Sequence, residues 1–210
     1  MKIIRTDEVY LDNTNSKMEE ALQVADEFIE ETKLSKRDGL HLRLLVEEVL
    51  GMVRAMTGDF TAVFDMEYSN YQCKIRLVAQ TIMDKEKKQE LLSLSTSGKN
   101  ASAKGFMAKI GEIIENGFLD YSEVARLQQE YGGNSLNYGF MGMDSIGAVD
   151  YACQWSLGNY RSALKDEMEE NAPAKEAYDE LERSIVASLA EDVIVGVKKD
   201  KVEVTVIMNI

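Results

Sequence analysis

The sequence predicts a globular domain that combines α-helices with β-hairpins. Two segments, 60–79 and 193–208, alternate apolar and polar residues on either side of a short polar turn, which is the pattern of a half-buried hairpin. Ahead of the first hairpin, apolar residues recur at helical spacing over 16–33 and again over 42–56. For a chain of 210 residues, these features favour one domain with a large insertion over two small domains.

The N-terminal segment predicts strand structure followed by a helix. Ile3, Ile4, Val9 and Tyr10 favour an edge strand or two short strands. Helix 16–33 then opens with a capping box, in which Ser16 and Glu19 each satisfy a backbone N–H that the first turn leaves unpaired.

The next two elements are a long helix and the first hairpin. Ser35 and Asp38 open the helix, and Gly58 lies just beyond its end. The following strands alternate in polarity, and Ser69-Asn70 is predicted to form the two-residue turn between them.

The C-terminal segment predicts one helix that leads into the second hairpin. Residues 174–190 are rich in Ala, Leu and Glu and predict a single helix. Residues 193–197 and 202–208 predict the strands of the hairpin, with the turn at Lys199-Asp200.

The segment between the hairpins has a different character. Residues 95–105 predict a loop, and two short helices are expected over 106–114 and 122–131. Five glycines between 132 and 147 disfavour a regular element there. A longer helix is predicted over 144–169, because apolar residues line one side of it.

Charge and cysteine content limit the classes of partner. A net charge of −13 argues against nucleic acid, which is bound through clustered Lys and Arg. The chain shows neither a secretory signal nor an apolar run of membrane-spanning length, so no membrane association is expected. Cys73 and Cys153 predict reduced, buried thiols in a cytoplasmic protein.

Two stretches resemble a known family. Residues 42–53, which read Leu-Arg-Leu-Leu-Val-Glu-Glu-Val-Leu-Gly-Met-Val, resemble the N-box helix of the GHKL, or Bergerat-fold, ATPases. Residues 185–197 and 202–208 resemble the closing helix and strands of that family, and the small bacterial anti-sigma-factor serine kinases are the most similar group.

The resemblance implies an α+β fold. This fold is a two-layer α/β sandwich in which helices cover one face of a mixed, mostly antiparallel sheet, the histidine-kinase-like ATPase fold. It implies a single domain over 1–210, with its core at 1–83 and 180–210 and a helical insertion at about 95–175.

In the family, the N-box helix carries a Glu that activates the attacking group and, four residues later, an Asn that holds Mg²⁺. Glu48 matches the Glu, but Met52 occupies the Asn position. A thioether is a soft ligand and binds Mg²⁺ poorly, because this cation prefers hard oxygen ligands.

Two further signatures of the family are altered. Gln80 and Ile82 fall where an Asp and a Gly contact adenine in the family, and Asp84 substitutes for the Asp only in a shifted register. The glycine-rich turn that precedes the last helix is missing from 170–184. The resemblance therefore implies a nucleotide site that has lost its chemistry.

These observations predict a degenerate GHKL-fold regulatory binding protein with weak or no ATP hydrolysis. It would need no cofactor, although ATP with Mg²⁺ remains open, and it would act on a protein partner, with a homodimer also open. The first alternative is an active ATP-binding serine kinase or ATPase, with Glu48 as general base and Gln80 and Asp84 at the nucleotide.

A second alternative is a small-ligand-binding module in the insertion. Aromatic residues gather there, and they predict either the core of the insertion or a surface for a partner or ligand. The candidate surface consists of Tyr138, Tyr151, Trp155 and Tyr160.

Overall fold

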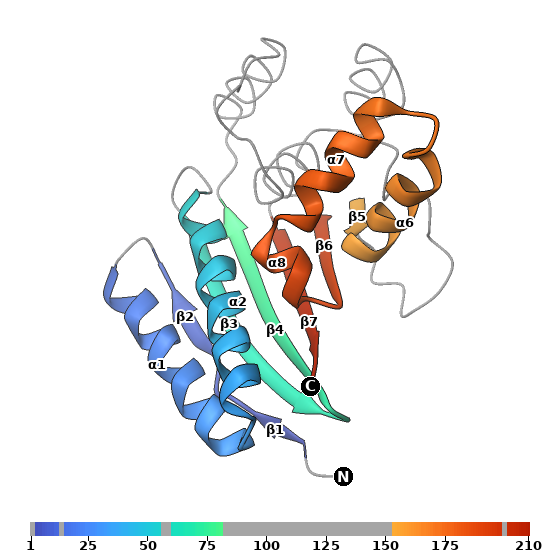
Figure 1. Ribbon diagram of the computed structural model, residues 1–210. Coiled ribbons are helices and arrows are strands. Elements are labelled where there is room, and N and C mark those ends of the chain that lie inside the picture. Colours follow the sequence, from blue (N-terminus) through green and yellow to red (C-terminus); the bar gives the residue numbers. More distant parts are fainter. Residues whose placement is uncertain (1–2, 13–14, 56–59, 82–152, 199–200) are drawn as a thin grey trace.

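The computed structural model describes residues 3–12, 15–55, 60–81, 153–198 and 201–210. In these residues the chain forms an open antiparallel sheet of seven strands with five helices (Figure 1). No helix in the described residues is long and apolar enough to cross a bilayer. The α+β class is therefore confirmed.

The strands lie in an order that differs from the order of the chain. The order across the sheet is β1-β3-β4-β7-β6-β5, and β2 also pairs with β3. Every pairing among the described strands is antiparallel, so the mixed sheet that the resemblance implied is not found in them. The strands are β1 (Ile4–Arg5), β2 (Val9–Leu11), β3 (Phe60–Ser69), β4 (Gln72–Thr81), β5 (Cys153–Ser156), β6 (Asp192–Lys198) and β7 (Lys201–Asn209).

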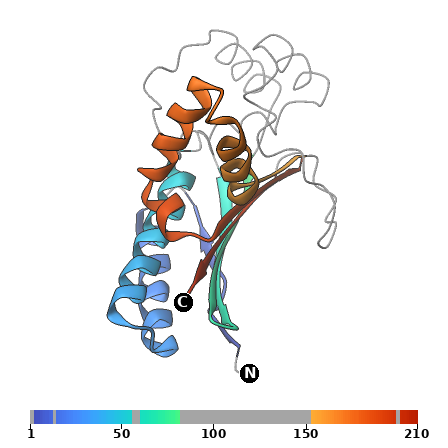
Figure 2. The same cartoon turned by 45° about the vertical axis from the view of Figure 1, so that its right-hand side comes forward.

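The described helices form a layer on one side of the sheet (Figure 2). They bury one apolar core against it, and Phe64, Leu77 and Val204 of the sheet are among its fully buried side chains. The helices are α1 (Asn15–Thr32), α2 (Lys36–Ala55), α6 (Leu157–Glu167), α7 (Ala172–Glu182) and α8 (Ile185–Leu189).

The sheet has a buried inner face and a polar outer face. Successive side chains of a strand point to opposite faces, so the buried positions of β3, β4 and β7 share the inner face with the helices. The residues that alternate with these buried positions along the strands form what we call the outer face. Its members are Arg5, Tyr10, Thr61, Val63, Asp65, Glu67, Lys74, Arg76, Val78, Gln80, Ile194, Lys201, Glu203, Thr205 and Ile207.

Most of the predicted elements are confirmed. The short strands near the N-terminus, both hairpins and the helices at 16–33 and after Ser35 lie within two residues of their predicted bounds. The second hairpin pairs Lys198 with Lys201, which agrees with a connection of two residues. The side chain of Ser16 lies outside the described part of the chain, so the capping box is not tested.

The turn of the first hairpin lies one residue later than predicted. Ser69 pairs with Gln72, so Asn70 and Tyr71 are the turn residues, with φ of 52° and 60°. A turn of this type needs positive φ at both central positions, and Asn tolerates that conformation better than Ser.

The prediction of one helix over 174–190 is wrong. α7 ends at Glu182, and Ser184 caps a separate short helix by accepting a hydrogen bond of 3.3 Å from the Ala187 N–H. The break lets α8 take its own direction and bury Val186 and Ala187 in the core.

The prediction of a helix over 144–169 is confirmed for Leu157–Glu167 and wrong for Cys153–Ser156. Cys153–Ser156 is an edge strand that pairs with Ile194–Val197, and α6 starts only at Leu157. Within the helical insertion predicted at about 95–175, residues 153–175 supply a strand, a helix and buried core residues to the main sheet. Residues 82–152 lie outside the described part.

Candidate functional site

Helix α2 carries Glu48, the residue predicted to be the general base. The helix starts with a reciprocal cap, in which Ser35 Oγ accepts a 3.1 Å hydrogen bond from the Asp38 N–H and donates one of 2.6 Å to Asp38 Oδ2. The Asp38 carboxylate also interacts favourably with the positive end of the helix dipole. The apolar face that fixes α2 on the sheet consists of Leu42, Leu45, Val46, Val49 and Leu50, all buried.

The neighbouring carboxylates of α2 lie on different flanks of the helix. Glu47 is exposed and accepts a 2.8 Å hydrogen bond from Arg43, which also contacts Asp26 of α1 at 2.7 Å. Glu48 follows 100° further round the helix, so it lies on the flank away from α1. Helix α8 contacts α2, and α2 lies between α1 and α8 (Figure 1). Glu48 is therefore on the α8 side and Glu47 on the α1 side.

The surroundings of the Glu48 side chain limit what its carboxylate can do. Its side chain is partly buried, at the edge of the apolar face of α2. Within the described residues, no ion pair or hydrogen bond is made by its carboxylate. Met52 follows one helical turn later, and its side chain lies outside the described part of the chain. A single carboxylate can accept a proton or a hydrogen bond, but it cannot hold a hard cation by itself.

Gln80 is directed away from Glu48. Its neighbour Ala79 is 3% exposed and faces the helices, whereas Gln80 is exposed on the outer face, between Thr61 and Lys201. Because Glu48 belongs to the helix layer, the sheet lies between these two side chains. The structure thus does not bring together the two described residues that were expected at one nucleotide. Ile82 and Asp84 lie outside the described residues.

Two of the predicted surface aromatics belong to the core. Trp155 is 1% exposed and Tyr160 is 8% exposed, and their ring centroids lie 5.8 Å apart at an interplanar angle of 48°. This tilted arrangement is typical of aromatic pairs that pack together. Trp155 is on the inner face of β5 and Tyr160 on the buried side of α6, so these rings offer little exposed surface to a partner. Tyr138 and Tyr151 lie outside the described residues.

Comparison with known proteins finds no family model that matches the chain, no similar curated protein and no similar solved structure.

No group of three or more acidic, His or Cys side chains that could hold a metal ion occurs in the described ranges. A hollow of about 290 Å³ lies along α7, lined by side chains that include Lys175, Glu176, Asp179 and Arg183. This hollow is on a different helix from Glu48 and mixes both signs of charge, so it matches none of the predicted site residues.

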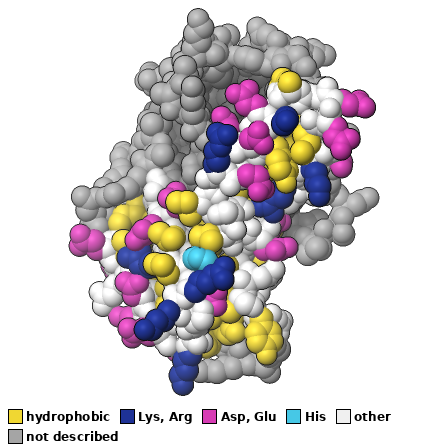
Figure 3. Space-filling model, viewed as in Figure 1, with side chains coloured by type: hydrophobic (Ala, Val, Ile, Leu, Met, Phe, Trp, Pro, Cys, Tyr) yellow, Lys and Arg dark blue, Asp and Glu magenta, His cyan; other side chains and the backbone are white. Residues whose placement is uncertain are grey.

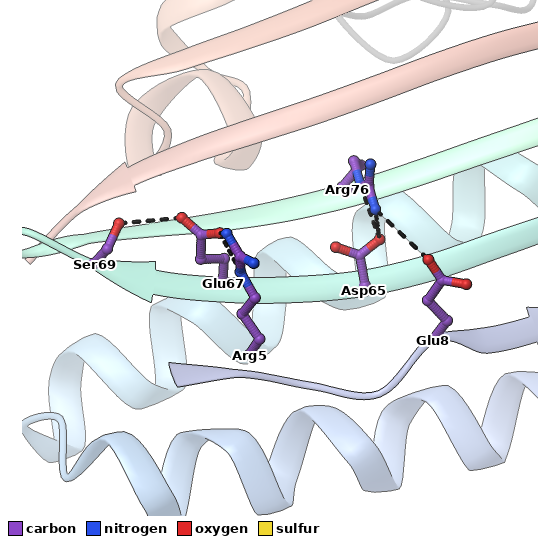
Figure 4. Close-up of polar contacts among 6 residues, drawn as sticks. All are labelled: Arg5, Glu8, Asp65, Glu67, Ser69 and Arg76. Atoms are coloured by element: carbon purple, nitrogen blue, oxygen red, sulfur yellow. Dashed lines mark hydrogen bonds and ion pairs between the residues drawn. The ribbon is translucent and has the colours of Figure 1, made fainter. Parts of the chain in front are cut away.

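The outer face carries polar contacts that the sequence analysis missed. Arg5 pairs with Glu67 at 2.6 Å, and Arg76 pairs with Asp65 at 2.8 Å (Figure 4). The hydrogen bond from Arg5 lowers the pKa of the Glu67 carboxyl, and the hydrogen bond to Asp65 raises the pKa of Arg76. The signal in the sequence is the placement of opposite charges at facing positions of the hairpin, such as Asp65 and Arg76.

Charge on the face of the molecule seen in Figure 3 is mixed. Acidic and basic side chains are interspersed over the described parts of the face seen in Figure 3, without a region of one sign.

Proposed function

We propose that this chain is a regulatory binding protein with a degenerate GHKL-type nucleotide site, related in plan to the anti-sigma-factor kinases, with weak or no ATP hydrolysis. The observation that carries the proposal is the separation of Glu48 from Gln80 by the sheet. A nucleotide pocket of that plan needs its base and its adenine contact on the same side. The residues that match these two roles are on opposite sides.

The resemblance to the family is supported by the order of the elements. Short strands, two helices and a hairpin are followed, after the segment 82–152, by helices and a closing hairpin. The helices cover one face of an antiparallel sheet, and α2 packs on β4. Fold-level likeness raises the prior for nucleotide binding but does not by itself supply a function.

The loss of catalysis is supported by the chemistry of the available side chains. Phosphoryl transfer depends on a metal ion that neutralises the developing charge and on groups that position the nucleophile. Met52 offers a thioether where an oxygen ligand is needed, and Glu48 is the remaining carboxylate of the motif. A protein of this kind acts by binding, and its partner is proposed to be another protein.

The two alternative functions have fewer of their expected residues in a position to act. An active kinase or ATPase would have to recruit an adenine contact other than Gln80, since Gln80 is on the outer face and Glu48 is on the side of the helices. A small-ligand module lined by aromatic rings would have to do without Trp155 and Tyr160, which are buried in the core.

The proposal is tested by ATP hydrolysis measured on the wild-type chain and on two matched variants, Glu48→Gln and Glu47→Gln. Both changes remove one carboxylate from the same helix, but only Glu48 matches the family's base. We expect phosphate release to be weak or absent and to be the same in the three proteins. A wild-type rate that falls about 100-fold in Glu48→Gln and is unchanged in Glu47→Gln would instead establish the active enzyme.

A further inference from the structure

The solvent side of α2 carries a line of side chains at coiled-coil spacing, which we call the outward stripe. Its positions follow one another at intervals of three and four residues, and its members are Arg37, Leu40, Leu44, Glu47 and Gly51. That spacing forms one line along a helix and is the seam through which helices pair. Leu40 is 60% exposed and Leu44 is partly exposed, whereas the core residues of α2 lie on its other side. Apolar side chains are visible on the helix side of the molecule in Figure 3.

Two features of α2 are not explained by packing among the described residues. Lys36 and Arg37 put positive charge into the first turn, where the helix dipole is already positive, and neither forms an ion pair with a described residue. Gly51 weakens a helix relative to Ala, yet a Cβ there would meet no atom within 4 Å beyond its chain neighbours and the backbone of its own helix. Local choices that weaken an element are expected mainly at functional sites. These features therefore indicate a contact with another molecule along the outward stripe.

The charges along the stripe are separated by sign. Lys36 and Arg37 lie at its N-terminal end, and Glu47 and Glu48 lie about three turns later, with the two leucines between them. Arg43 pairs with Glu47 at 2.8 Å, but the Glu47 side chain is 50% exposed, and an exposed pair of this kind contributes little. The carboxylate of Glu47 therefore remains open to a second cation. Charges in this order match a helix that is acidic at one end, apolar in the middle and basic at the other end.

The two helices beside α2 differ in what they present to solvent. On one flank, α1 presents the exposed carboxylates of Glu19, Glu27 and Glu30. On the other flank, α8 contacts α2 and carries Ile185, which is 50% exposed. Apolar surface is therefore offered by α2 and α8, whereas α1 offers negative charge.

We propose that the outward stripe docks an amphipathic helix of a partner protein. This helix packs parallel to α2 and carries apolar residues in its middle, acidic residues toward its N-terminus and basic residues toward its C-terminus. That order of charges complements the stripe and also suits the dipole of the partner helix. A second copy of this chain is a poorer occupant, because the net charge of −13 opposes self-association. The proposal rests on the protein partner of the proposed function and not on its nucleotide site.

Fluorescence anisotropy of a labelled synthetic peptide, titrated with the full chain, tests the proposal. The peptide has about three heptads, with Leu at the seam positions of the middle heptad, Glu in the first heptad, Lys in the last and Ala elsewhere. The control peptide has the same composition, with Glu and Lys mixed along its length. We expect the first peptide to bind at least about tenfold more tightly than the control. Because both titrations use the wild-type chain, this comparison does not depend on the folding of a variant.

Two matched variants locate the binding on the stripe. Leu40→Lys should weaken binding of the first peptide at least about tenfold, whereas Tyr71→Lys, at a 68% exposed position of the first hairpin turn, should leave it unchanged.

Three results would overturn the proposal: no binding of the first peptide at about 1 mM chain, equal binding of the two peptides, or binding that Leu40→Lys leaves intact. Self-association of the chain that Leu40→Lys abolishes, without peptide binding, would assign the stripe to a second copy instead. Phosphate release is measured separately from peptide binding, so failure of the proposed function and failure of this docking surface are distinguishable.

Discussion

Asp192 Oδ1 accepts a hydrogen bond of 2.9 Å from the Gly158 N–H, which joins the start of β6 to the first turn of α6. The same oxygen accepts a 2.8 Å bond from the Val193 N–H. Ser156 caps the same helix, since its Oγ accepts a 3.1 Å bond from the Asn159 N–H. These contacts explain why the chain turns from strand to helix at residue 157, where the apolar pattern alone predicted a continuous helix.

Asp192→Ala should destabilise the fold by about 1–2 kcal/mol, because two partly buried backbone N–H groups lose their acceptor. Chemical denaturation followed by circular dichroism measures the change. Asp192→Asn keeps an acceptor oxygen and should recover most of the stability. If the alanine variant were as stable as the wild type, these contacts would have no role in holding α6 on the sheet.

Two glycines of α2 should respond in opposite directions to alanine. A Cβ at Gly39 would lie 2.9 Å from Ile29 Cγ2 of α1, so Gly39→Ala should cost about 1–2 kcal/mol through overpacking. A Cβ at Gly51 meets no atom within 4 Å beyond its chain neighbours and the backbone of its own helix, and Gly51→Ala should gain up to about 1 kcal/mol from helix propensity. Thermal unfolding of the two variants compares them directly. Equal effects would mean that α1 and α2 do not approach closely at Gly39.

The Cys73 thiol should be unreactive in the folded protein. It is fully buried, and burial raises its pKa from 9.0 to about 12. The thiolate is the reactive form, so a Cys153→Ser chain should react with a disulfide reagent at neutral pH only after denaturation. Because the raised pKa favours the neutral thiol of the folded state, stability should also fall as the pH rises above 9. Rapid labelling under native conditions would contradict this.

The Arg5–Glu67 pair should contribute a small amount to the free energy of unfolding, and this contribution should be lost in acid. The pKa of Glu67 is lowered from 4.5, chiefly by the hydrogen bond from Arg5, so its contribution is present above pH 4.5 and is lost as the pH falls through the lowered pKa. Arg5 is 67% exposed, which limits the effect to about 1 kcal/mol or less. Urea titrations of Glu67→Gln and wild type should differ more at pH 7 than at pH 3.

Much of the fold could be predicted because its signals are local. Alternation over 60–79 and 193–208 and the helical spacing over 16–33 depend only on neighbouring residues. The misassigned elements depend on distant contacts. Strand β5 exists because Ile194–Val197 pairs with it, and the separation of α7 from α8 depends on the cap at Ser184.

The candidate site was predicted less well. A motif match gives the sequence position of a residue, but not the face of the helix or sheet on which its side chain lies. The alternation along the predicted strand already places Gln80 on the face opposite Ala79, but a motif match takes no account of it. Similarly, the sequence left both a core and a partner surface open for Trp155, and the pairing of β5 with β6 places it on the inner face of the sheet.

Calorimetric titration of ATP and ADP into the purified chain, with and without Mg²⁺, tests the central claim most directly. With Glu48 and Gln80 on opposite sides of the sheet, the account predicts no heat of binding up to millimolar nucleotide, for the wild type and for Glu48→Ala alike. Micromolar, Mg²⁺-dependent binding that Glu48→Ala abolishes and Glu47→Ala preserves would contradict it and would establish a working nucleotide site on α2.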